Sequence, residues 1–159
     1  MSKVALTEWV EALVAAANQL AIESLGFEEG EIVATETSLG SLASGSLIAL
    51  VGNQNSVEVG LCASEANCVS LARAFLGMEP EDGELSRADL DDALGEMVNV
   101  MAGALKARIH EKIPGMQLGL PIVFQGLLGA STNAEVMVVH IRWQDVEAQT
   151  VLIRSASGG

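Results

Sequence analysis

The stretch Asp92-Ala-Leu-Gly-Glu96-Met-Val-Asn99 predicts the helix on which the rest of the chain is built. At about 100° per residue, Asp92, Glu96, Asn99 and Gly103 fall within a stripe roughly 60° wide on one side of that helix. The opposite side carries an apolar face that consists of Leu90, Leu94, Met97, Val98, Met101 and Leu105. The stretch therefore predicts a long amphipathic helix whose outer face is small and polar.

Two glycines, Gly95 and Gly103, border this polar stripe. A glycine inside a helix costs about 1 kcal/mol relative to alanine, and an interior asparagine costs a few tenths. Such residues lower the stability of the helix and leave an outer face that another molecule can approach closely. The alternative is a solvated helix face with two tolerated glycines, and the periodicity alone does not separate the two interpretations.

Composition limits the class of protein. A chain of 159 residues fits one domain, or two small repeats that share a core. Half of the residues (50%) are hydrophobic, but the aromatic residues are only 2 Trp and 3 Phe, so we expect an aliphatic, methionine-rich core. The formal charge of −13 is spread along the chain and argues against nucleic acid or an anionic membrane as a partner.

Residues 1–9 contain no apolar signal-peptide core, and no window reaches the roughly 18 apolar residues of a membrane helix, so we expect a cytoplasmic protein. In that reducing compartment Cys62 and Cys68 are expected to be free thiols, and their spacing matches neither a redox CxxC nor a zinc knuckle. His110 and His140 stand alone, so we expect no metal site. His110 is expected near the end of a helix and His140 within a strand.

Helices and strands alternate along the chain. Thr7 can cap a helix that runs to about residue 25, Ser64 caps one over 65–76, and Ser86, with Asp89 three residues on, begins the long helix that runs to about Lys112. Strands are expected at 31–39, 47–51, 56–63, 116–124, 135–143 and 149–154. Residues 40–45 and 78–85 are expected to be linkers and 155–159 a frayed tail.

The two halves of the chain, residues 5–77 and 86–154, each contain a long helix followed by three strands, and only the first ends in a shorter helix. A shift of 85 residues places Thr7 on Asp92, Glu11 on Glu96 and Val14 on Asn99. If the halves are duplicated units, the first helix keeps the glutamate and lacks the asparagine. No glycine-rich phosphate loop and no Gly-x-Ser-x-Gly elbow is present.

The pattern Asp92-xxx-Glu96-xx-Asn99, followed by Met101-Ala-Gly103 and then Pro121, resembles the phosphatase motif of the CheC/CheX/FliY family of bacterial chemotaxis proteins. Twenty-one residues separate Asn99 from Pro121, which is close to the family spacing. The helix-then-three-strand repeat extends the resemblance over nearly the whole chain. The chain is most similar to CheX, because one motif stands in the second long helix and the first helix is degenerate.

The resemblance implies an α+β fold in a single domain (1–159), with two pseudo-symmetric helix-plus-three-strand halves, an antiparallel sheet and two long exposed helices. It implies an enzyme that dephosphorylates the phospho-aspartate of a CheY-type response regulator. Asn99 would position the hydrolytic water, and Glu96 would pair with the active-site lysine of the regulator. Asp92, Gly95 and Gly103 would contact the regulator, and Pro121 would shape the adjoining strand.

The resemblance also implies that this chain binds no cofactor, because the regulator carries the Mg²⁺. CheX-like proteins form homodimers through exchanged strands, and the strand at 135–143 is a candidate for that interface. An acidic protein gains no long-range attraction to an acidic, phosphorylated regulator, so we expect modest affinity. Two alternatives stay open: a non-catalytic scaffold that binds the regulator or assembles like a flagellar switch protein, and a paralogue that serves a regulator outside chemotaxis.

Overall fold

The computed structural model describes residues 4–40, 44–53, 55–126 and 133–155. Its helices are α1 (Leu6–Ser24), α2 (Glu65–Leu76) and α3 (Arg87–Ile109), with a 3-10 turn η1 at Pro80–Asp82. Its strands are β1 (Glu31–Glu36), β2 (Ser44–Val51), β3 (Ser56–Ala63), β4 (Gln117–Leu118), β5 (Ile122–Gln125), β6 (Ala134–Trp143) and β7 (Val146–Ser155). Within the described ranges, no helix is long and apolar enough to cross a membrane.

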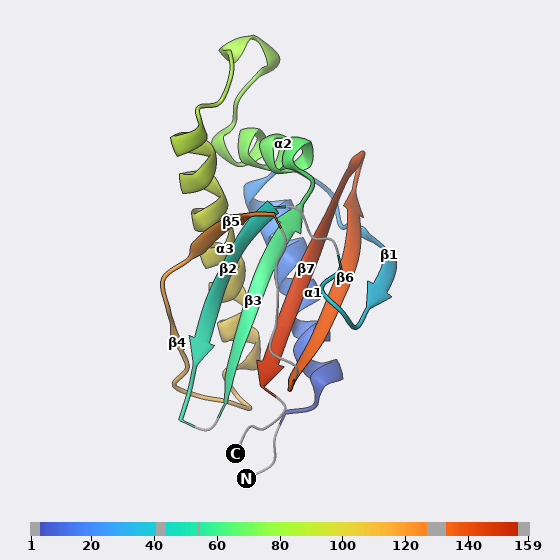
Figure 1. Ribbon diagram of the computed structural model, residues 1–159, viewed down its shortest axis with the longest axis vertical. Coiled ribbons are helices and arrows are strands. Elements are labelled where there is room, and N and C mark those ends of the chain that lie inside the picture. Colours follow the sequence, from blue (N-terminus) through green and yellow to red (C-terminus); the bar gives the residue numbers. More distant parts are fainter. Residues whose placement is uncertain (1–3, 41–43, 54, 127–132, 156–159) are drawn as a thin grey trace.

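The described strands form one sheet in the order β1-β6-β7-β3-β2-β4, with β5 also paired to β2, and every pairing is antiparallel. The long helices α1 and α3 lie side by side behind the sheet, and α2 crosses one end of it (Figure 1). All three helices contribute to one buried cluster against the sheet. The α+β class, the antiparallel sheet and the two long helices are therefore as predicted.

The order of the strands has a two-fold pattern. The third strands of the two halves, β3 and β7, pair at the centre, and the second strands, β2 and β6, flank them. The first strand of each half crosses over: β1 pairs with β6, and β4 and β5 pair with β2. The boundaries of the two repeats (5–77 and 86–154) stay a prediction.

Local signals placed two of the helix starts correctly. The Ser64 hydroxyl accepts the N–H of Asn67, and the Ser86 hydroxyl accepts the N–H of Asp89, each at 3.1 Å. The prediction that Thr7 caps the first helix was wrong, because Ala5 occupies the N-cap position without a side-chain cap. Leu6 packs against the core, so apolar packing extends the helix beyond its best capping residue.

Several strand boundaries differ from the prediction. β1 ends at Glu36 rather than at residue 39, and β2 begins at Ser44, inside the predicted linker 40–45, of which residues 41–43 lie outside the described ranges. β7 begins at Val146 rather than at residue 149, because Trp143 pairs with Val146 across a two-residue turn in which Gln144 has a φ of 57°. A left-handed glutamine is uncommon, so the sequence carries no usual turn signal there. Residues 156–159 of the predicted tail are not described.

The strand at 135–143, the candidate for an interface through exchanged strands, corresponds to β6, which lies inside the sheet. It pairs with β1 on one side and with β7 on the other. β1 forms the sheet edge on that side, and all six of its residues are exposed. Whether the chain forms a homodimer stays a prediction.

The two histidines lie where the sequence predicted them. His110 follows the last residue of α3, and His140 lies in β6, where its Nε2 is 3.6 Å from Glu36. Cys62 and Cys68 are free and buried. Among the described residues, no three His, Cys, Asp or Glu side chains gather into a possible metal site.

Neither cysteine is expected to react with iodoacetamide in the folded protein at pH 8. Burial, with a smaller contribution from the neighbouring Cys68, raises the pKa of Cys62 from 9.0 to about 12, and burial raises the pKa of Cys68 to about 11. The thiolate that reacts is therefore scarce until the protein unfolds. Mass spectrometry with and without urea checks this, and fast alkylation of the native protein would contradict it.

The same shifts make stability depend on alkaline pH. In the unfolded chain the thiols lose their protons near pH 9.0, whereas the folded protein holds them to about pH 11 or above. The free energy of unfolding contributed by the thiols is thus constant below pH 9.0 and falls as the pH rises above it. A Cys62→Ala/Cys68→Ala variant is the control and should lack this part of the fall.

Candidate functional site

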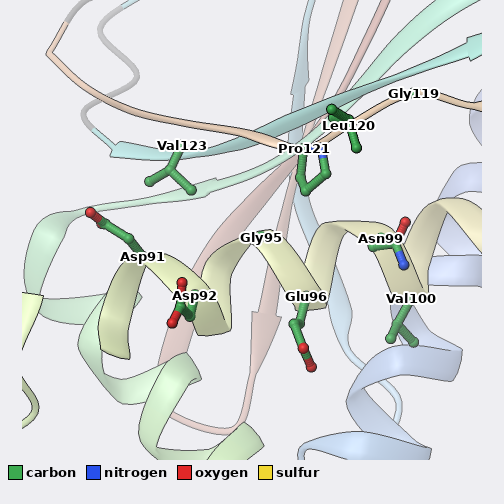
Figure 2. Close-up of a pocket in the computed structure, with 10 residues that line it drawn as sticks. All are labelled: Asp91, Asp92, Gly95, Glu96, Asn99, Val100, Gly119, Leu120, Pro121 and Val123. Atoms are coloured by element: carbon green, nitrogen blue, oxygen red, sulfur yellow. The ribbon is translucent and has the colours of Figure 1, made fainter. Parts of the chain in front are cut away.

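The polar face of α3 opens into a groove of about 680 Å³ beside the chain segment that joins β4 to β5. From α3 the groove is lined by Asp91, Asp92, Gly95, Glu96, Asn99 and Val100, from the facing segment by Gly119, Leu120 and Pro121, and from β5 by Val123 (Figure 2). Five of the residues predicted for the site, namely Asp92, Gly95, Glu96, Asn99 and Pro121, therefore line one groove.

The facing segment exists because the predicted strand 116–124 is broken. Leu118 pairs with Leu50 and Ile122 with Leu47, so three residues (119–121) stand opposite two residues of β2. The Gly119 N–H still donates to the Ala49 carbonyl at 2.8 Å, but Pro121 has no N–H to donate. The extra residue forms a bulge, which is a usual way for a proline to be tolerated in a sheet.

The bulge rests on α3 at Gly95. Gly95 is buried, and a Cβ at that position would lie 3.5 Å from Cγ of Pro121, which is ordinary van der Waals distance. The proline ring therefore lies beside the helix at residue 95, at a distance that leaves room for a methyl group. The proposed contact between Gly95 and a partner stays a prediction.

A second contact holds α3 to the sheet beneath the groove. The hydroxyl of the fully buried Ser46, on β2, donates to the Leu94 carbonyl at 2.8 Å. Ser46 pairs with Val123 of β5, so one residue of β2 connects both walls of the groove. The groove is therefore built on rigid elements, as precise positioning of side chains requires.

Ionic and polar contacts fix the N-terminal end of the helix. Arg87 Nε lies 3.0 Å from Oδ1 of Asp91, and Glu65, the first residue of α2, accepts from Gln125 of β5 at 3.0 Å and from Arg87 at 3.4 Å. Exposed pairs of this kind contribute little stability, but together they join α2, α3 and β5 at one corner. Asp91 is therefore an anchored residue of the groove wall.

The three polar residues of the predicted motif are exposed and differ in direction. Asn99 lies on the flank of α3 toward Leu120 and Pro121, whereas Asp92 and Glu96 project from the helix away from that segment (Figure 2). A molecule that covers this face of α3 would meet the carboxylates and the amide together. The helix period produces this order, since residues four apart lie about 40° from each other around the axis.

The chemistry that these side chains offer is narrow. The groove residues include three carboxylates, one amide and no Lys, Arg, Ser, Cys or His. The Asn99 amide both donates and accepts hydrogen bonds, so it can orient a water molecule without changing its own protonation state. Among the described residues, the groove therefore provides no hydroxyl or thiol nucleophile and no positive charge for a phosphate.

Gly103 does not line this groove. It lies one turn further along α3, in a smaller hollow of about 290 Å³ between α3 and α1, and a Cβ there would meet no atom within 4 Å. Val100 belongs to both hollows. A partner contact at Gly103 therefore stays a prediction that requires a partner extending toward α1.

The sequence reasoning did not single out Asp91, Val100, Gly119, Leu120 or Val123. A signal for the bulge is present: Gly119 and Pro121 stand close together inside an otherwise strand-like stretch, and such residues in a strand mark bulges. For Asp91 and Val100 no local signal exists, because only the position of the β4–β5 segment decides which flank of the helix faces the groove.

Comparisons with known proteins agree with this architecture. The family model "Chemotaxis phosphatase CheX" matches residues 44–142. No curated protein sequence matches the chain significantly.

Solved structures resemble the fold. A chemotaxis protein CheX from Desulfovibrio desulfuricans is 17% identical with a TM-score of 0.77, and the match covers 93% of this chain and 99% of that one. The CheX of a CheX–CheY–BeF3–Mg²⁺ complex from Borrelia burgdorferi is 17% identical with a TM-score of 0.70, over 92% and 96% of the two chains. FliY from Thermotoga maritima is 15% identical with a TM-score of 0.63, over 98% and 93%.

Proposed function

Because the chain belongs to the CheX family of chemotaxis phosphatases, we propose that it removes the phosphoryl group from the phosphorylated aspartate of a CheY-type response regulator. The observation that carries the proposal is the groove on α3, where Glu96 and Asn99 are exposed beside a bulge whose Pro121 ring lies next to Gly95. The partner would be a CheY-type regulator, as in the CheX–CheY complex from Borrelia burgdorferi.

The reaction needs little from the phosphatase except position. In an aspartyl phosphate the water oxygen forms a bond to phosphorus, the bond from phosphorus to the carboxylate oxygen breaks, and inorganic phosphate leaves with the protons of the water. The developing negative charge requires cations, and the polar side chains among the described groove residues are carboxylates and an amide. We therefore assign the cations, Mg²⁺ and a lysine, to the regulator, and the orientation of the water to Asn99.

Glu96 is proposed as the docking residue. It lies one helical turn before Asn99, so a lysine of the regulator that pairs with its carboxylate would align the phosphoryl group along the helix. Asp92, one turn earlier, is proposed as a supporting acid at the edge of the contact. In this arrangement both carboxylates contact the regulator, and neither lies next to the phosphorus atom.

Replacing Glu96 with glutamine is expected to raise KM for the phosphorylated regulator about tenfold or more, with kcat little changed. A hydrogen bond to a charged group contributes about 1.5–3 kcal/mol, and the amide would keep the size but lose the charge. The measurement is release of inorganic phosphate from CheY-type regulators phosphorylated with acetyl phosphate. Glu11→Gln, the corresponding position on α1, is the matched control and should behave as wild type. An unchanged KM for Glu96→Gln would contradict the docking role.

The second candidate is a non-catalytic scaffold of the same fold, which binds a regulator or assembles like a flagellar switch protein. The exposed Asn99 favours the enzyme, because a scaffold needs no amide at that position. The same assay separates the two: a scaffold binds a regulator without shortening the lifetime of its phosphoryl group. A paralogue that serves a regulator outside chemotaxis would show the activity with a different member of the regulator panel.

We place the protein in the cytoplasm, where response regulators are phosphorylated, and we expect no cofactor bound to this chain. A homodimer through exchanged strands remains part of the proposal, with the strand at 135–143, now β6, as the candidate interface. Sedimentation measurements would test that expectation.

A further inference from the structure

Leu120 is the most exposed large hydrophobic residue in the part of the chain that the structure describes. Its side chain is 87% exposed, ahead of Ile122 at 63%. It lines the same groove as Glu96 and Asn99, although it takes no part in the core of this chain. A fully exposed leucine on the rim of a polar groove is the kind of residue that gains most from being covered.

The backbone holds this leucine firmly in place. On one side the Gly119 N–H donates to the Ala49 carbonyl at 2.8 Å, and on the other side Pro121 rests on the buried Gly95. Because the bulge is tied both to the sheet and to α3, Leu120 loses little freedom when a partner covers it. The side chain is thus preorganised for contact.

The described residues of the groove are acidic, so affinity for a phosphorylated partner needs a source other than charge, and an apolar contact would supply it. The described groove residues include Asp91, Asp92 and Glu96 without any Lys or Arg, and the chain carries a net charge of −13. A phosphorylated partner is not drawn to such a surface at long range. Affinity must then come from short-range contacts, of which burial of apolar surface is the strongest general source.

Two exposed apolar side chains bracket the amide. Leu120 lies on one side of Asn99 and Val100, which is 42% exposed, lies on the other (Figure 2). A partner that covers both would bury an apolar side chain on each side of the amide.

We propose that Leu120 is the apolar anchor of the groove: it packs against an apolar patch beside the phosphorylated aspartate of the regulator and sets the affinity and the choice among regulators. This inference rests on the proposed function. Leu120 is a specificity-determining residue in this proposal, because it touches the body of the partner and not the reacting atoms.

The test compares Leu120→Ser with Ile122→Ser. Ile122 is two residues away and also exposed, but along an extended strand it points to the opposite face from Val123, which lines the groove. Leu120→Ser is expected to raise KM roughly tenfold or more, as follows from losing one buried leucine, with kcat unchanged. The Kd for a beryllofluoride-activated regulator should rise by the same factor. Ile122→Ser should match wild type.

Each other outcome overturns the inference. An unchanged KM for Leu120→Ser, or equal effects of Leu120→Ser and Ile122→Ser, would show that the leucine is not an anchor. A fall in kcat alone would assign it to the chemistry instead, and a changed sedimentation coefficient would assign it to a contact between copies of this chain. Asn99→Ala is measured alongside: if it loses activity while Leu120→Ser does not change, only the anchor fails. If wild type speeds no dephosphorylation, the proposed function fails as well.

Discussion

Replacing Asn99 with alanine is expected to lower kcat for dephosphorylation by a factor on the order of 10² or more, while KM and regulator binding change little. Of the described groove residues, Asn99 alone has a side chain that can both donate to and accept from a water molecule without titrating. Without it the water is no longer held in line with the bond that breaks. The measurement is phosphate release, with binding of the beryllofluoride-activated regulator measured in parallel.

Loss of folding would not explain this result. Asn99 is exposed within α3, and alanine has the higher helix propensity, so the variant should gain a few tenths of a kcal/mol of stability. Asn99→Asp is a second, isosteric variant. It keeps an acceptor, loses the donor and adds a negative charge, and it should be as inactive as alanine. Wild-type activity in Asn99→Ala would disprove the water-positioning role.

Replacing Gly45 with alanine is expected to reduce the free energy of unfolding by about 3 kcal/mol or more, as overpacking in a tight core does. A Cβ at Gly45 would lie less than 3.0 Å from the Leu61 carbonyl oxygen and from Cα of Cys62. Both are backbone atoms of β3 at the centre of the sheet, so no side chain can turn aside to make room. The urea midpoint measures the loss.

The matched control is Gly103→Ala, which has the opposite expected sign. Its Cβ would meet no atom within 4 Å, and the change adds helix propensity worth about 1 kcal/mol. If Gly45→Ala and Gly103→Ala lowered the free energy of unfolding equally, the loss would come from the conformational freedom of glycine and not from the lack of room for a Cβ. Gly45 also pairs with Phe124 of β5, so Gly45→Ala should disturb the groove wall together with the fold.

The helices of this fold could be predicted from the sequence because the signals that define them are local. The period of Leu90, Leu94, Met97 and Leu105 predicted the buried face of α3, and Ser86 predicted its first turn. The partner of each strand is not local information. Nothing near β1 indicates that it pairs with β6, which lies more than a hundred residues further along the chain.

The residues of the site on α3 could likewise be predicted from local signals, and the residues that depend on strand pairing could not. Helix geometry and the family resemblance brought Asp92, Glu96 and Asn99 to one face of α3. The burial of Gly95 and the exposure of Leu120 both follow from the bulge, and the bulge follows from the register between β2 and the segment after β4. Register is set by pairing across the sheet, so periodicity along one segment could not reveal it.

The crossover of the first strands has a consequence for synthesis of the protein. β1 is translated early, but among the described strands its partner is β6, so on the ribosome this pairing cannot form until residues near 143 have emerged. Pairing over so long a stretch of chain gives a high contact order, and folding on the scale of milliseconds to seconds is typical of such topologies. An N-terminal fragment released early would thus expose the unpaired edges of β1 and β2, which are templates for aggregation.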